Sequence, residues 1–103
     1  MAIYGIGCDY DGKYVGNDFY TKGVACIGYS PEDKPYLYGI IKEVGIGDFI
    51  IMKSFFQRRK KQVLRIKGIG IITNNALKRV KGLGHCIQLK WLKYAANYIL
   101  ELE

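Results

Sequence analysis

The stretch QVLRIKGIGIIT, residues 62–73, decides the fold class of this chain. Its residues alternate between two faces, as the side chains of a β-strand do. One face would carry Val63, Arg65, Lys67, Ile69 and Ile71, and the other Leu64, Ile66, Gly68, Gly70 and Ile72. Glycines at two of these positions allow the sharp bend that small closed barrels require. The stretch therefore predicts a long strand in a strongly curved sheet.

Three other stretches have the composition of strands. They are Ala2–Asp9, the Ile- and Phe-rich residues 48–56, and Cys86–Tyr94, in which Ile87, Leu89 and Trp91 alternate with polar residues. The last stretch, 95–103, is compatible with either a strand or a short helix. The pairs Asp11-Gly12 and Asn74-Asn75 predict turns.

Two short helices complete the predicted elements. The first spans residues 15–22, where Asn17 or Asp18 would cap it and Gly23 would end it. The second begins near Pro35 and runs to about Val44, with an apolar stripe of Leu37, Ile40, Ile41 and Val44. Residues 24–35 lie between the helices, and their glycine, serine and prolines predict mostly loop.

These elements predict one domain over residues 1–103, because a chain of 103 residues supports a single modest core. The fold class is α+β: a small curved mixed β-sheet or barrel, with two short helices that cover one opening.

Charge is distributed unevenly along the chain. Residues 1–52 hold four lysines and seven acidic residues, for a net charge of −3, whereas residues 53–103 hold twelve basic and two acidic residues, for a net charge of +10. Such polarity predicts one basic face and a polyanionic partner. Half of the residues are hydrophobic, which excludes a disordered chain.

The three cysteines, Cys8, Cys26 and Cys86, are odd in number and far apart in sequence. We therefore expect buried free thiols, with no disulfide and no metal site. A reducing, cytoplasmic location follows from that expectation. No apolar run reaches the roughly 18 residues of a membrane span, and the first residues do not resemble a signal peptide, so no membrane partner is expected.

Nothing in the sequence requires catalysis. His85 is the only histidine, and it stands beside Cys86, so on a strand the two side chains would point to opposite faces. A structural or solvent-facing histidine is therefore expected. Glycine-rich phosphate-binding motifs are absent from the sequence. We predict no catalytic residue, no metal and no cofactor.

Binding signals are stronger than catalytic ones. The run Arg58, Arg59, Lys60 and Lys61 stands between two predicted strands, and Arg65 and Lys67 follow on the next strand. Such cations at a hairpin tip can follow a phosphate backbone. Lys78, Arg79 and Lys81 form a second basic cluster. The chain also holds nine tyrosines, four phenylalanines and one tryptophan, enough for a core and a base-stacking platform.

Several segments resemble the EVE-like branch of the PUA superfamily, in particular the small N-terminal sensor domains of McrBC-type restriction ATPases. The most specific is LRIKGIGIITN, residues 64–74. The others are FYTKGVACIGY at 19–29, YLYGIIKEV at 36–44, GDFIIMK at 47–53 and LKWL at 89–92.

The resemblance implies a non-enzymatic module that reads a base, often a modified one, flipped from DNA or RNA. Carried over to this chain, the base pocket would comprise Asp9, Tyr10, Tyr29, Lys53, Phe55 and Trp91. The phosphate contacts would come from residues 58–61, Arg65 and Lys67. No ATPase or nuclease motif is present, so the chain is expected to act as a reader alone.

Two other functions stay open. The chain could be a stand-alone sponge, of the kind a phage could encode, that sequesters a free linear or cyclic nucleotide signal and so blunts a defence pathway. It could also be an inhibitor that binds a partner protein through its basic face. The sequence is also compatible with a homo-oligomer.

Overall fold

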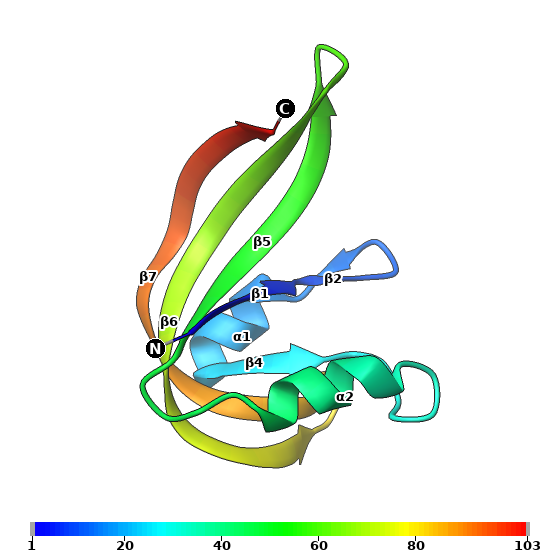
Figure 1. The fold of residues 1–103 in the computed structure, drawn as a ribbon, viewed down its shortest axis with the longest axis vertical. Helices are drawn as coiled ribbons and strands as arrows, with labels where there is room; N and C mark the ends of the chain where they lie inside the picture. The colour runs from blue at the N-terminus through cyan, green and yellow to red at the C-terminus, as the bar shows by residue number, and fades with distance from the viewer. Residues whose placement is uncertain (1, 103) are drawn as a thin grey trace.

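A strongly curled five-stranded sheet forms the body of the molecule (Figure 1). The structure, a computed structural model, describes the backbone of residues 2–102 and the side chains of residues 2–94 and 99. The strand order is β1-β5-β6-β7-β4, with bounds β1 Ile3–Gly7, β4 Val24–Ile27, β5 Phe49–Arg58, β6 Lys61–Val80 and β7 Gly84–Leu102. Among these strands, only β1 and β5 pair in parallel. The predicted α+β class with a curved mixed sheet is confirmed.

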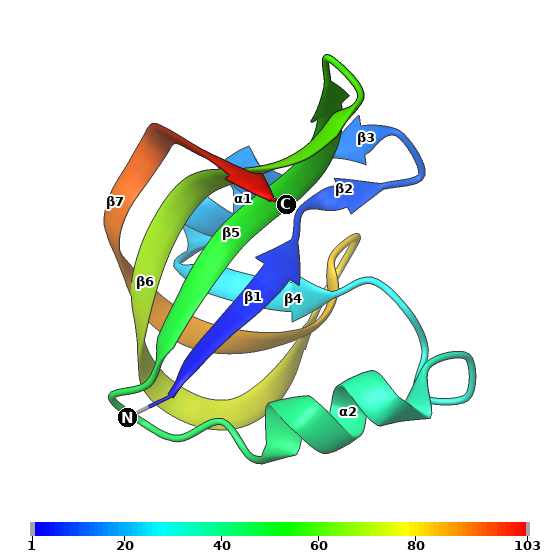
Figure 2. The same cartoon turned by 45° about the horizontal axis from the view of Figure 1, so that its top comes forward.

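The curl of the sheet brings its two edge strands toward each other. Strands β1 and β4 stand at opposite ends of the strand order, yet Figure 2 shows their ends approaching across the open side of the half-barrel. We call the unpaired space between β1 and β4 the seam. It is the feature of the fold that positions the site described below.

A small hairpin and a helix follow β1. Strands β2 (Asp9–Tyr10) and β3 (Lys13–Tyr14) are joined through Asp11 and Gly12, whose φ angles are 50° and 85°. The predicted turn is therefore confirmed, because Asp and Gly tolerate this backbone region well. Helix α1 (Gly16–Lys22) ends at Gly23 in the left-handed conformation, as predicted.

The predicted cap of α1 is wrong. Val15 occupies the N-cap position, and no side chain caps the helix. Asn17 and Asp18 instead lie within the first turn. There the acidic side chain of Asp18 favours the helix through the positive end of the helix dipole.

Helix α2 (Pro35–Lys42) lies across one end of the half-barrel (Figure 1). Proline suits its first position, because the ring fixes a helical φ where no N–H partner is needed. The buried residues of the helix are Tyr38 and Ile41, whereas Ile40 is 47% exposed. The predicted apolar stripe was wrong at this residue, because Tyr38 turns inward with its hydroxyl hydrogen-bonded.

Strand β6 is longer and less regular than predicted. It runs through Asn74 to Val80, so the predicted turn at residues 74–75 is replaced by register shifts against β7. Met52 pairs with Gly68 and Lys53 with Ile66, which makes Lys67 an extra residue in β6. Such a bulge reverses the alternation of faces beyond it. Hence Val63 is buried before the bulge, and Gly68, Gly70 and Ile72 are buried after it.

Strand β4 and its disulfide correct two further predictions. Residues 24–27 form a strand rather than loop, and Cys26 lies directly opposite Cys86 on β7. A backbone bond from Leu89 to Gly23 places this cysteine pair at a non-hydrogen-bonded position, where cross-strand side chains approach closely. The two cysteines form a disulfide, and Cys8 is a buried free thiol. The cysteines therefore no longer support the expected cytoplasmic location.

The N-terminal end of β1 is fixed by a carboxylate. Asp48 accepts hydrogen bonds from the backbone N–H groups of Ala2 at 3.0 Å and Gly45 at 2.9 Å. These two bonds hold the pKa of Asp48 below its usual value, because they favour the charged form. Asp48 thereby ties the loop after α2 to the start of β1.

Two buried clusters fill the interior. One lies under α2 and includes Ile41, Ile50 and Ile87, and the other lies beside α1 and includes Phe19, Met52 and the disulfide. Among the helices that the structure describes, none has the length and apolar character needed to span a membrane.

Candidate functional site

The seam holds a cavity of about 450 Å³, which we call the seam cavity. Its walls come from both edge strands, the β2–β3 hairpin, the loop after β4, helix α2 and strand β5. The lining residues are Gly5, Ile6, Gly7, Asp9, Tyr10, Asp11, Cys26, Ile27, Gly28, Tyr29, Leu37 and Lys53. A cavity of this size, with aromatic, aliphatic and a few charged groups, is typical of small-molecule sites.

One wall of the seam cavity is the free edge of β1. The Phe49 N–H donates to the Ala2 carbonyl at 2.9 Å, and backbone direction alternates along a strand. The N–H and C=O groups of Gly5 and Gly7 therefore point away from β5, toward the seam. Gly7 is the more open of the two, because a Cβ atom there would meet nothing within 4 Å, whereas the Lys53 side chain lies against Gly5.

Tyr10 forms a second wall, and its position is fixed from two sides. Its hydroxyl donates to the Leu83 carbonyl at 2.7 Å. Its ring covers Gly28 so closely that a Cβ atom there would lie 2.7–2.9 Å from three ring atoms. Burial raises the pKa of Tyr10 to about 12, with a smaller effect of Tyr38, so the phenol stays protonated at neutral pH.

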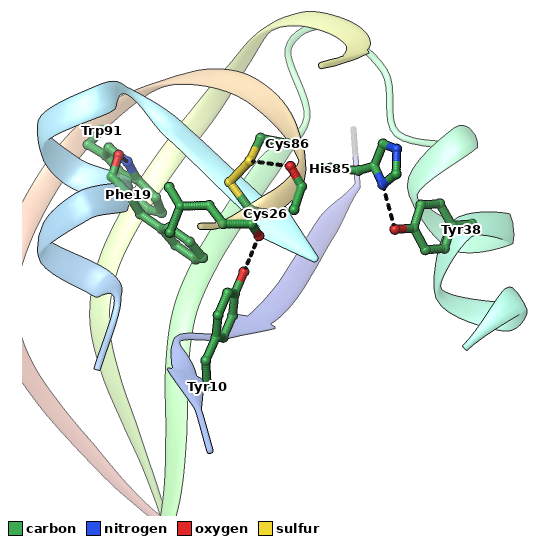
Figure 3. The surroundings of a disulfide bond; sticks show 9 residues. Tyr10, Phe19, Cys26, Tyr38, His85, Cys86 and Trp91 are labelled. Carbon is green, nitrogen blue, oxygen red and sulfur yellow. Dashed lines mark hydrogen bonds between the residues drawn. A yellow bond between two sulfur atoms is a disulfide. The ribbon is translucent and has the colours of Figure 1, made fainter. Parts of the chain in front are cut away.

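Tyr29 also lines the seam cavity, and the residue as a whole is 55% exposed. Its backbone is held by Tyr38, whose hydroxyl donates to the Tyr29 carbonyl at 2.7 Å. Since that hydroxyl has only one hydrogen, it accepts its second bond from Nδ1 of His85, 2.8 Å away (Figure 3). His85 thus positions Tyr38, and Tyr38 positions the Tyr29 loop, in keeping with a structural histidine.

A second cavity, of about 500 Å³, adjoins the seam cavity, and we call it the turn cavity. Tyr10 and Gly28 line both cavities, and the β6–β7 turn supplies the other lining residues: Arg79, Val80, Lys81, Gly82, Leu83 and Gly84. Gly84 is required there, because a Cβ atom would lie 2.2 Å from the Ile27 carbonyl oxygen. The residues described as lining the turn cavity include two cations and no acidic side chain.

The structure brings together four of the six residues predicted for the base pocket. Asp9 and Tyr10 from β2, Tyr29 from the loop after β4 and Lys53 from β5 all line the seam cavity. The Lys53 side chain reaches the seam cavity by crossing β1 at Gly5. It lies so close to Gly5 that a Cβ atom there would be 2.6 Å from the lysine Cε.

Phe55 and Trp91 do not line either cavity. Phe55 is 49% exposed further along β5, with the Lys53 ammonium 4.7 Å from its ring centre. The Trp91 indole N–H donates to the Phe19 carbonyl at 2.9 Å. Figure 3 shows Trp91 on the side of the disulfide away from Tyr38, so it packs in the core beside α1.

The predicted phosphate contacts lie apart from both cavities. Residues 58–61 form the β5–β6 turn, at the end of β6 opposite Arg79 (Figure 1). The Arg65 guanidinium lies 4.7 Å from the Phe56 ring centre, and the Lys67 ammonium lies 4.5 Å from that of Tyr14. The cations beside the cavities are instead Arg79 and Lys81, which the sequence shows as a basic cluster next to turn glycines.

The histidine and the paired cysteines near the cavities are already engaged with other groups. His85 is engaged with Tyr38, and the Cys26 and Cys86 sulfurs are joined to each other. Among the side chains that the structure describes, no group of three His, Cys, Asp or Glu residues is placed to hold a metal ion. The two cavities instead offer aromatic faces, carboxylates, backbone groups and cations.

Comparison of the chain with protein families, curated proteins and solved structures found no match. The fold and the cavities therefore define a small α+β domain with a curled mixed sheet and a cavity between its edges. The resemblance to the EVE-like branch of the PUA superfamily stays a prediction.

Proposed function

We propose that the chain is a nucleic-acid-binding module that holds one base, modified or unmodified, in the seam cavity and acts without catalysis. The observation that carries the proposal is that aromatic and polar side chains from several segments converge on one cavity, while two cations line the cavity beside it. A base needs an aromatic face and a polar edge, and its phosphate needs a cation.

Each part of the two cavities has a counterpart in a nucleotide. Tyr29, an exposed residue that lines the seam cavity, is placed to stack its ring on a base, and the carboxylates and the β1 backbone are placed to contact the edge of the base. Arg79 and Lys81 would then contact the phosphate, because Tyr10 and Gly28 are shared by both cavities. The cations of residues 58–61 would contact only a longer strand, since they lie at the other end of β6.

The stacking role is tested by Tyr29→Ala, with the affinity for a labelled single-stranded oligonucleotide measured by fluorescence anisotropy. We expect an affinity loss of about 5- to 150-fold, the range for losing one base–aromatic stack. The variant keeps the backbone carbonyl that Tyr38 uses. Tyr36→Ala is the matched control, because Tyr36 is 62% exposed on α2 and lines neither cavity. Equal affinity of both variants and the wild type would contradict the proposal.

A free nucleotide is the second candidate ligand. The two cavities share Tyr10 and Gly28, so a single nucleotide could place its base in one and its phosphate in the other. A sponge of this kind should bind mononucleotides or cyclic dinucleotides with submicromolar affinity in calorimetry. Replacing residues 58–61 by alanine should then leave affinity unchanged, whereas the same change should weaken binding of an oligonucleotide.

A further inference from the structure

The two cavities differ in the sign of their charge. Asp9 and Asp11 line the seam cavity with a single cation, Lys53, whereas the described lining of the turn cavity holds Arg79 and Lys81 without an acidic residue. A phosphate would therefore be repelled from the seam cavity and attracted to the turn cavity. This polarity orients a nucleotide, with the base end in the seam.

The Asp9 carboxylate is left for a ligand. Asp9 is exposed at the start of β2, and within the described part of the chain no hydrogen bond or ion pair uses its carboxylate. An ionised carboxylate only accepts hydrogen bonds, so it selects ligands that present N–H donors. Asp11 also lines the cavity, but it lies in the hairpin turn with a φ of 50°. Asp9 is the closer of the two aspartates to β1, which ends at Gly7 and whose free edge lines the seam. We therefore choose Asp9 over Asp11.

We propose that the seam cavity selects guanine, with the Asp9 carboxylate accepting hydrogen bonds from the N1–H and N2–H groups of the base. This inference rests on the proposed function and names its base. Guanine is the common base with two adjacent N–H donors on its Watson–Crick edge. Adenine and cytosine offer one amino group beside an acceptor nitrogen, and thymine or uracil offers one N–H between two carbonyls. In each of those bases, an acceptor would face the carboxylate.

The backbone of β1 supports the same choice. Gly5 and Gly7 direct N–H donors as well as carbonyl acceptors toward the cavity, because their backbone groups face the seam. The O6 carbonyl of guanine, next to N1–H, would find its donor among these N–H groups or at the Lys53 ammonium. A guanine edge would then leave no donor or acceptor unpaired, which is the condition for strong discrimination between bases.

The test uses thymine-rich single-stranded oligonucleotides that differ only at the central base: guanine, hypoxanthine, adenine or cytosine. Hypoxanthine keeps N1–H and O6 but lacks the N2 amino group. We expect the wild type to bind the guanine oligonucleotide about 10- to 100-fold more tightly than the hypoxanthine one, the range for a bidentate contact. Adenine and cytosine should bind more weakly still.

Variants assign the contact to one carboxylate. Asp9→Asn should reduce the preference for guanine over hypoxanthine to within about 3-fold, because the amide presents a donor in place of an acceptor. Asp33→Asn, the same change outside both cavities, should keep the preference. Asp11→Asn should keep it too. Retention of the preference in Asp9→Asn, or its loss in Asp11→Asn instead, would overturn the assignment.

The two proposals fail in different ways. Equal affinity for all four oligonucleotides, or a preference for another base, would overturn the guanine inference and leave the base-binding function intact. Absence of binding to every oligonucleotide, with the wild type folded by circular dichroism, would overturn both.

Discussion

The β5–β6 turn places two long cationic side chains in a backbone conformation that suits neither. Arg58 pairs with Lys61, so Arg59 and Lys60 form a two-residue hairpin turn, with φ angles of 52° and 65°. Asn-Gly is the preferred sequence for a turn with two positive φ angles. A left-handed backbone costs an ordinary residue roughly 1–2 kcal/mol. The turn therefore keeps its two cationic side chains at the expense of stability.

Replacing the turn by Asn-Gly should raise stability. For the double variant Arg59→Asn/Lys60→Gly we expect the free energy of unfolding to rise by about 1–2 kcal/mol, less than the full backbone term because glycine also gains freedom in the unfolded chain. For a domain of this size, the melting temperature should rise by about 5–10 °C, measured by calorimetry.

A charge-matched control separates backbone relief from charge removal. Arg59→Gln/Lys60→Gln removes the same two charges but keeps ordinary side chains in the left-handed backbone, so its melting temperature should stay near that of the wild type. Both double variants should bind oligonucleotides with a shallower salt dependence, by about 0.7 in slope for each phosphate that is no longer neutralised. A melting temperature that is unchanged in the Asn-Gly variant, or raised equally in both variants, would refute the reasoning.

Three further perturbations test the site and its supports. Replacing Cys26 and Cys86 together by alanine should lower stability by about 2–4 kcal/mol, because the disulfide closes a long loop, and calorimetry without reductant will measure it. Gly28→Ala should displace the Tyr10 ring, seen as a changed near-ultraviolet circular dichroism spectrum and weaker oligonucleotide binding. Asp48→Asn should destabilise the fold at neutral pH, and the difference from wild type should vanish in acid. The sign follows because the depressed pKa of Asp48 adds stability above its unfolded-state pKa, and that stability is lost as pH falls through its folded-state pKa.

Each of these variants has a control or a contrary result. Gly39→Ala is the control for Gly28, because a Cβ atom at Gly39 meets nothing within 4 Å. Cys8→Ala replaces the buried cysteine outside the disulfide. An equal loss of stability in this variant would show that the disulfide bond itself does not stabilise the fold. For Asp48, a wild-type advantage that persists at low pH would show that the carboxylate charge is not what holds the two N–H groups.

Local chemistry made much of the fold predictable. Pro35, Gly23 and the Asp11-Gly12 pair marked helix and turn boundaries through their own backbone preferences, and those elements are present. The strand at residues 62–73 was recognisable, but its faces were not, because the bulge at Lys67 depends on how β6 pairs with β5. The residues of this stretch do not by themselves predict the register of that pairing.

The site was predictable only in part, for the same reason. Tyr10 and Tyr29 follow strand and loop signals along the chain, and both line the seam cavity. Trp91 alternates correctly on β7 but faces the core beside α1, which depends on the curl of the sheet. The Cys26–Cys86 bond joins residues 60 apart in sequence, so only the register of β4 on β7 reveals it.

The seam has walls of unequal stiffness. Strand β4 is tied to β7 by backbone hydrogen bonds and by a covalent bridge, whereas β1 is held by its pairing with β5 and by Asp48 at one end. If a ligand binds in the seam cavity as proposed, we expect β1 to shift more than β4, because only β4 carries the covalent bridge. The disulfide would then keep the β4 wall in place, and the width of the cavity would depend on the position of β1.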